Sequence, residues 1–89
     1  MATIATSYAT GVVTVTGSGY STDDVFVNVS FTATVGVRRY NEMRRAPVAG
    51  GALNYPVPIP FTGGSVVVRS LDPTVPTFTI LATSGSQAV

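Results

Sequence analysis

The stretch Val25–Val37, VFVNVSFTATVGV, alternates between two sets of residues. Its odd positions are all valine, phenylalanine or alanine, and its even positions are mostly small and polar. Successive side chains of a strand point to opposite faces, so this pattern predicts a strand with one apolar face and one half-covered polar face. The valine and threonine content also disfavours a helix. We expect residues 25–37 to form the central strand of the fold.

Shorter segments with strand composition precede and follow it, namely Thr3–Thr10, Val12–Thr16, Tyr55–Phe61, Val66–Leu71 and Thr77–Thr83. Clusters of glycine, serine, aspartate and proline between them favour turns. We interpret Gly17–Asp24 as a hairpin connection that leads directly into the central strand, and Phe61–Ser65 as a second hairpin turn. Asp72–Pro76 is a third predicted turn.

The number and spacing of these segments predict an all-β fold. We expect residues 1–89 to form a small single-domain β-sandwich or barrel of about six to seven antiparallel strands. The cysteine pair and tryptophan of immunoglobulin domains are missing. At most one short helical turn is expected near 38–46, because Pro47 would end any helix there. Residues 84–89 are expected to be a loose tail.

Three alternating prolines, Pro56, Pro58 and Pro60, mark the segment YPVPIPF. Residues two apart in an extended chain point their N–H groups to the same side, so the prolines remove donors from one edge only. This predicts an edge strand, or a polyproline-like segment, with one side unable to pair. The spacing does not match the PxxP pattern of proline-rich ligands.

The residue types argue against catalysis and against bound cofactors. The chain contains no histidine, cysteine or lysine, which removes the commonest catalytic bases, nucleophiles and zinc ligands. No phosphate-binding loop is present. The carboxylates are Asp23, Asp24, Glu42 and Asp72, and the adjacent pair Asp23–Asp24 fits a turn better than a Ca²⁺ site. We expect no enzyme activity, no metal and no cofactor.

Two arginine pairs form the sharpest candidate binding feature, consisting of Arg38, Arg39, Tyr40, Arg44 and Arg45. Arginine offers planar, bidentate donors, and arginine and tyrosine are enriched at interfaces. We therefore expect contact with an acidic patch on another protein or a neighbouring subunit. Internal pairing with Glu42 in a solvated loop, and binding of nucleic acid, are the alternatives, but a nucleic-acid site would usually carry more basic residues.

Charge is absent from three long stretches, Met1–Thr22, Ala46–Val68 and Pro73–Val89. A small domain without disulfide or zinc commonly gains stability by association, and a charge-poor surface suits burial by neighbours. We therefore expect a homo-oligomer or a larger assembly. Prolines interrupt the longest uncharged run, and no signal peptide is visible, so neither a transmembrane segment nor export is expected.

The start at Met1-Ala2, the lack of cysteine and histidine, the Thr/Val/Gly/Ser-rich strands and the charge-free ends resemble small accessory structural proteins of tailed bacteriophages, such as head decoration (cement) proteins and small tail components. The resemblance implies a non-enzymatic virion component, assembled in the host cytoplasm, that binds and stabilises a capsid or tail surface as a symmetric oligomer.

Two other classes of binding protein compete with this hypothesis. A small monomeric immunoglobulin-like or carbohydrate-binding module would need an exposed aromatic platform, for which the candidates are Tyr8, Tyr20, Tyr40 and Tyr55. An inhibitor that occupies a nucleic-acid site on an enzyme would need more acidic residues than this chain carries.

Overall fold

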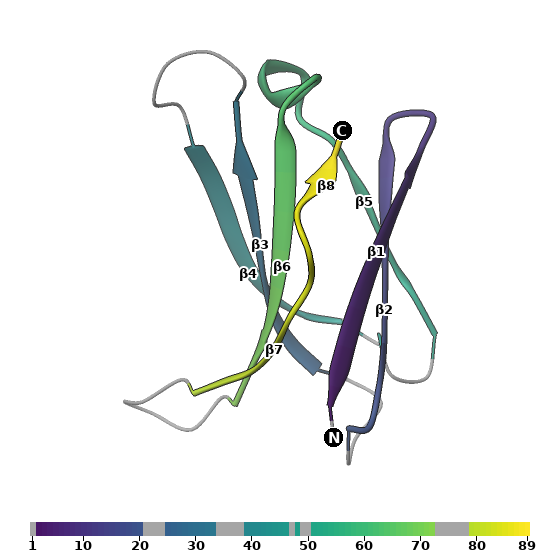
Figure 1. Cartoon of the computed structure of the whole chain (residues 1–89), viewed down its shortest axis with the longest axis vertical. Helices are drawn as coiled ribbons and strands as arrows, with labels where there is room; N and C mark the ends of the chain where they lie inside the picture. The colour runs from purple at the N-terminus through teal and green to yellow at the C-terminus, as the bar shows by residue number, and fades with distance from the viewer. Residues whose placement is uncertain (1, 21–24, 34–38, 47, 49–50, 73–78) are drawn as a thin grey trace.

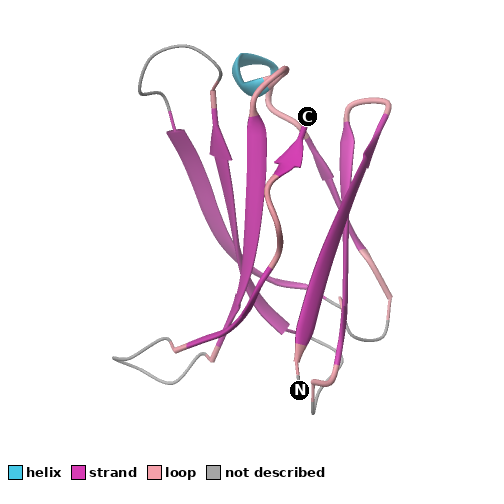
Figure 2. Cartoon of the chain, in the orientation of Figure 1, coloured by secondary structure: helices cyan, strands magenta, loops and turns pink. Residues whose placement is uncertain are grey.

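A computed structural model of the chain describes residues 2–20, 25–33, 39–46, 48, 51–72 and 79–89. The described residues form eight strands and one short 3-10 helix (Figures 1 and 2), which confirms the all-β prediction. The elements are β1 (Thr3–Ala9), β2 (Val12–Ser18), β3 (Val25–Thr32), β4 (Arg39–Ala46), β5 (Leu53–Pro56), η1 (Ile59–Phe61), β6 (Ser65–Leu71), β7 (Ile80–Thr83) and β8 (Gln87–Ala88).

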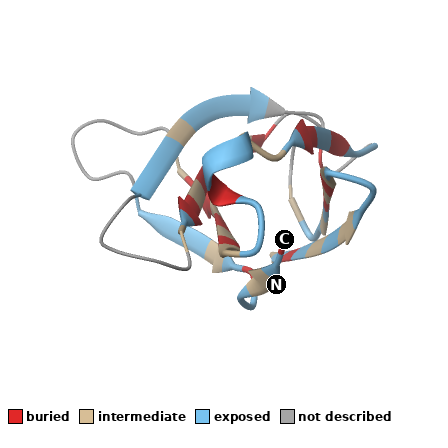
Figure 3. Ribbon diagram, turned by 90° about the horizontal axis from the view of Figure 1, so that it is seen from above, coloured by how far each residue is buried: buried red, intermediate tan, exposed pale blue. Residues whose placement is uncertain are grey.

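The strands form two antiparallel sheets that pack face to face as a β-sandwich. Sheet A has the order β1-β2-β5, and sheet B has the order β4-β3-β6-β7 with β8 also paired to β6. Figure 1 shows sheet A beside sheet B, with β4 as the outermost strand of sheet B. Figure 3 shows buried residues gathered between the two sheets.

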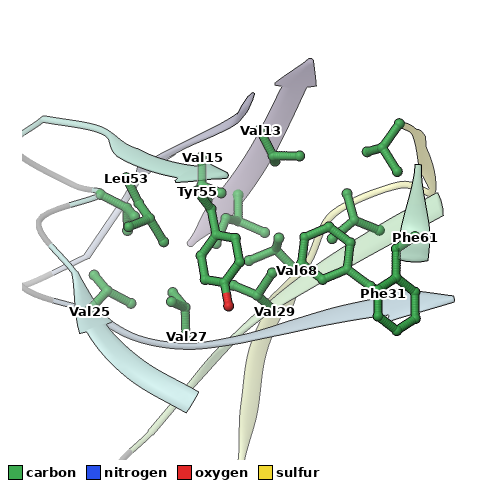
Figure 4. Packing of buried hydrophobic residues seen from close by; sticks show 14 residues of the cluster. Val13, Val15, Val25, Val27, Val29, Phe31, Leu53, Tyr55, Phe61 and Val68 are labelled. Carbon is green, nitrogen blue, oxygen red and sulfur yellow. The ribbon is translucent and has the colours of Figure 1, made fainter. Parts of the chain in front are cut away.

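The central strand β3 has the predicted alternation, and Val25, Val27, Val29 and Phe31 are all buried. They pack against buried side chains from sheet A and from β6 in one cluster (Figure 4). The strand ends at Thr32, one residue before Ala33, which is described but not in the strand, and residues 34–37 of the predicted span lie outside the described residues.

The predicted hairpin between β2 and β3 is wrong, because the two strands belong to different sheets. β2 pairs with β1 and β5, whereas β3 pairs with β4 and β6. The connection therefore crosses the sandwich, and the hydroxyl of Tyr20 lies 2.6 Å from Ser70 Oγ on sheet B, to which it donates. Alternating patterns on neighbouring segments identify two strands, but they do not distinguish edge-to-edge pairing from face-to-face packing.

The proline-rich segment agrees with its prediction only at its start. β5 is an edge strand of sheet A, and the N–H of Val57 donates to the carbonyl of Gly11 at 2.9 Å. Beyond it, Ile59–Phe61 turns into the 3-10 helix, whose first turn tolerates Pro60 because no helical partner needs its missing N–H. The Phe61–Ser65 turn joins the two sheets and is not a hairpin.

The stretch near 38–46, where the sequence allows at most one short helical turn, has no helix in its described part, because Arg39–Ala46 is strand β4. All eight residues pair with β3 in one regular antiparallel register, from Arg39 opposite Thr32 to Ala46 opposite Val25. Composition is a weak guide to helix in this stretch, and pairing with the most strongly patterned strand of the chain overrides it.

The predicted turn Asp72–Pro76 and the predicted last strand are described only in part. Residues 73–78 lie outside the described ranges, and the N–H of Asp72 donates to the carbonyl of Thr79 at 2.8 Å. Strand β7 covers the second half of the predicted strand Thr77–Thr83.

The prediction of a loose tail at residues 84–89 is also wrong. Ser84 is buried and its Oγ accepts a hydrogen bond from the N–H of Val68 at 2.9 Å. Val89 is buried too, and it exchanges backbone hydrogen bonds with Gly63 and Gly64 at 2.6 and 3.1 Å. The last residues therefore belong to sheet B and its core.

Candidate functional site

Strand alternation in β4 sends the predicted partner-binding residues to two different faces. Tyr40, Glu42 and Arg44 lie directly opposite buried residues of β3, so they are on the core-facing side of sheet B. Arg39 and Arg45 lie on the outer face. Almost all of β4 is exposed, as the longest pale strand of Figure 3 shows. Arg38 lies outside the described residues.

The core-facing residues of β4 form a polar rim where the two sheets meet. Arg44 Nε lies 3.1 Å from Glu42 Oε1, and Arg44 Cζ lies 5.4 Å from the ring centroid of Tyr55 on β5. The Tyr55 hydroxyl donates a long 3.4 Å hydrogen bond to the Tyr40 hydroxyl, which in turn donates to Glu42 Oε2 at 3.4 Å. These contacts link sheet B to sheet A at the open side of the sandwich.

Aromatic rings pack against this polar rim on its core side. The Phe31 ring lies 5.6 Å from Tyr55 and 5.9 Å from Phe61, measured between centroids, and Tyr40 lies 6.2 Å from Phe61. All three pairs are tilted, an arrangement that aromatic rings favour. Figure 4 shows Tyr55 reaching from β5 across the core toward β3.

Burial raises the pKa of Tyr55 above its ordinary value of 10.0. The hydrogen bond with Tyr40 and the negative charge of Glu42 act in the same direction. Glu42 Oε1 is itself shielded from solvent and accepts no hydrogen bond from the described residues, because the Arg44 contact is an ion pair by distance without hydrogen-bond geometry. The carboxylate thus keeps unused acceptor capacity.

The outer face of sheet B carries two exposed arginines, Arg39 and Arg45, and one half-buried arginine, Arg69. Arg39 and Arg45 project from β4, and Arg69 of β6 joins them because it lies opposite Asn28 of β3, whose own opposite residue on β4 is Met43. The described strand residues on this face include no carboxylate, since Glu42 points to the other side. We call Arg39, Met43, Arg45, Arg69 and Ile80 the basic face.

Apolar side chains share this face with the arginines. One row across the sheet reads Arg45, Phe26, Leu71 and Ile80, from β4 to β7. Met43 and Ile80 are 42% and 53% exposed. Mixed arginine and apolar surface is typical of protein interfaces, where charge at the rim surrounds a desolvated centre.

Sequence reasoning found part of this face and missed part of it. It singled out Arg39 and Arg45 but grouped them with Arg44 and Tyr40, which a strand places on the opposite side. It missed Arg69, although the alternation in VVVRSL places Arg69 and Val67 on the other face of the strand from the buried Val66 and Val68. The alternation of apolar and polar residues along β6 could have placed Arg69 on the outer face.

The basic face is too extended to hold one small anion. Arg39 and Arg45 are six residues apart on one strand, a distance of about 20 Å at the usual rise per residue. Arg69 is two strands away from Arg45, or about 10 Å across the sheet. The three guanidinium groups therefore suit a distributed acidic surface better than a single phosphate.

The tyrosines do not form the platform that a carbohydrate-binding module would need. All four lie among the described residues, where Tyr55 is buried and Tyr8 and Tyr20 are partly buried against the core. Tyr40 is 39% exposed, but its ring lies on the core-facing side of β4.

A metal site and a membrane-spanning helix are both absent from the described residues. No three histidine, cysteine, aspartate or glutamate side chains come together there as metal ligands, and Asp23 and Asp24 lie outside the described ranges. The same part of the chain has no helix with the length and apolar character of a membrane span. No family model, curated protein sequence or solved structure is significantly similar to this chain.

Proposed function

We propose that this protein is a non-enzymatic structural or assembly protein that binds an acidic protein surface through the basic face of sheet B. The observation that carries the proposal is that Arg39, Arg45 and Arg69 share one face of sheet B with exposed Met43 and Ile80, with no carboxylate among the described strand residues of that face. Arginine in this setting combines bidentate donation with apolar contact.

A larger assembly is the setting that best explains such a surface. The opposite face, on sheet A, presents uncharged residues such as Thr3, Ser7, Thr14 and Thr16. The charged residues of the described strands thus all lie on sheet B, which gives binding a defined orientation. Together with the resemblance to small tailed-phage accessory proteins, this supports a role on a capsid or tail surface.

Two double variants with the same change in net charge test the binding face. Arg39→Gln with Arg45→Gln removes two positive charges from the basic face, and Thr14→Glu with Thr16→Glu adds two negative charges to sheet A. The probe is poly-L-glutamate at fixed ionic strength, because surface electrostatics weaken with salt. We expect the arginine pair to weaken binding about tenfold or more, and the threonine pair to change it little.

Two results would overturn the binding face, and a third would remove the virion setting. Equal losses in both double variants would show that net charge alone governs binding. Tighter binding to a single-stranded DNA oligonucleotide of equal charge would favour nucleic acid as the partner. For the virion setting, mass spectrometry of purified particles from a producing culture should detect the chain in a fixed ratio to the major structural protein, and its absence would remove that part of the proposal.

A further inference from the structure

We propose that the free edge of β4 pairs antiparallel with β4 of a second copy of this chain, with Glu42 of each copy opposite Arg44 of the other. The two copies would join their B sheets into one continuous sheet. This inference goes beyond the basic face, because it uses the backbone edge and the core-facing residues of β4.

β4 is the longest sheet edge without a proline or a bulge among the described strands. It has eight residues, no proline and no irregularity in its register. β5 has four residues and ends at Pro56, and β7 has four residues next to a register shift. Such prolines and bulges block pairing, whereas a long regular edge offers unpaired N–H and C=O groups to another strand.

The other long edge, β1, is placed differently. Figure 1 shows β1 beside β8 and β7, and β1 contacts β6, β7 and β8 of sheet B. That side of the sandwich is therefore partly closed by the chain itself. β4 lies at the far end of sheet B, where it pairs with β3 alone among the described strands.

Two-fold symmetry restricts how two copies of β4 can align. Residues directly opposite each other in an antiparallel pair share a face, so core-facing residues must oppose core-facing residues. Two such registers overlap over seven residues of β4, one centred on Glu42 and the other on Met43. A register centred further along the strand loses at least two of these residue pairs.

Charge separates the two long registers. Centred on Glu42, the pairing sets Glu42 against its own copy and Arg39 against Arg45 twice, and like charges directly opposite destabilise a sheet. Centred on Met43, it sets Glu42 against Arg44 twice and Arg45 against Asn41 twice. The second register has no like-charge pair, and the Glu42 carboxylate, whose Oε1 accepts no hydrogen bond from the described residues, gains a second arginine.

The first measurement is the mass of the unmodified protein by light scattering over a concentration series. We expect a transition to twice the 9.2 kDa of the chain. A monomer at every concentration up to the solubility limit would overturn the proposal. This test does not involve poly-L-glutamate. A monomeric protein would therefore not count against the proposed binding role of the basic face. In the same way, a lack of poly-L-glutamate binding would not count against the dimer.

Two single charge reversals then test the register. Glu42→Arg and Arg44→Glu each place like charges opposite each other twice in the homodimer, so each variant alone should dissociate at least about tenfold more readily. In a mixture of the two, the arginine introduced in the first variant opposes the glutamate introduced in the second, and the unchanged Arg44 opposes the unchanged Glu42. The mixture should therefore form a heterodimer. Within each variant chain, positions 42 and 44 still carry the same charge, so mixing does not restore the ion pair inside either copy.

Rescue on mixing is thus intermolecular and does not arise from repair of either fold. Two variants that remain monomeric when mixed, while both are folded by circular dichroism, would contradict the register. If Arg44→Glu still dimerised alone, the register centred on Glu42 would be favoured instead and the proposal would be wrong.

Single cysteines provide a second test that preserves charge, because the chain has no cysteine of its own. Met43→Cys places the new thiol opposite its own copy, close enough for a disulfide under mild oxidation. Asn41→Cys is the matched control on the same exposed face, where the thiol would oppose Arg45. We expect a disulfide-linked dimer for Met43→Cys only. Equal cross-linking at the two positions, or none at Met43, would overturn the proposal.

Discussion

Arg44 Nε lies 3.1 Å from Glu42 Oε1, and both side chains point toward the core side of an edge strand. Charged residues that point inward on an edge strand discourage indiscriminate pairing with other chains. The two side chains are 45% and 33% accessible, so water screens the pair in part, although Glu42 Oε1 itself is covered. We therefore expect the pair to contribute little to the stability of the fold.

Replacement of the carboxylate should therefore have little effect on the monomer. We expect Glu42→Gln to change the free energy of unfolding by less than about 1 kcal/mol, as is usual for exposed ion pairs. Urea denaturation of dilute protein measures this. A loss of about 3 kcal/mol or more, typical of a broken buried pair, would show that the rim stabilises the fold.

Alkaline pH should destabilise the protein through Tyr55. Its pKa is raised in the folded state, so the neutral hydroxyl stabilises the fold fully below pH 10.0, the ordinary tyrosine pKa. That contribution is lost progressively as the pH rises above this value, because the unfolded chain ionises more readily. The melting temperature of the wild type should fall more steeply above pH 10 than that of Tyr55→Phe. Identical slopes would be inconsistent with a raised pKa.

The turn between β1 and β2 contains a strained residue. Thr10 and Gly11 form a two-residue loop in which both φ angles are positive, +50° and +77°. This is the signature of a type I′ turn, which favours Asn-Gly, and a β-branched residue there is costly. Thr10→Asn should raise the free energy of unfolding by about 1 kcal/mol. Thermal unfolding checks this, and a destabilised Asn variant would contradict the turn assignment.

Gly64 is required for steric reasons. A Cβ added there would overlap the carbonyl oxygen of Thr32 and approach that of Phe61 to 3.1 Å. Both obstacles are backbone, which has little room to move, so Gly64→Ala should lower the free energy of unfolding by about 2 kcal/mol. Gly85→Ala is the matched control, since a Cβ there meets nothing within 4 Å. Equal effects in the two variants would argue against the close approach of the Gly64 backbone to the Thr32 carbonyl.

The sequence predicted best where one face of a strand is buried. The alternation in β3 identified its core residues Val25, Val27, Val29 and Phe31, because burial on one side imposes a period of two. β4 escaped notice because its core-facing residues, Tyr40, Glu42 and Arg44, lie at the rim and are polar. Apolar and polar residues do not alternate along β4. It forms a strand because it pairs with β3 in the tertiary structure, which its own composition does not report.

The local sequence pattern could not predict which of the two sheets each strand joins, because this also depends on tertiary pairing. The segment after β2 contains glycine, serine and aspartate whether it closes a hairpin or crosses to the other sheet. The pairing of β3 with β6 joins segments far apart in sequence, and no local turn chemistry reports on it. The membership of Arg69 in the basic face depends on that pairing.

The most direct test of the account is to map where an acidic probe touches the folded protein. Nuclear magnetic resonance of isotopically labelled protein, titrated with poly-L-glutamate, reports the affected residues without any substitution. We expect the Nε signals of Arg39, Arg45 and Arg69 to shift together, with the backbone amide signals of the sheet A residues Thr14 and Thr16 unchanged. Shifts centred on sheet A, or spread equally over both faces, would contradict a binding role for the basic face.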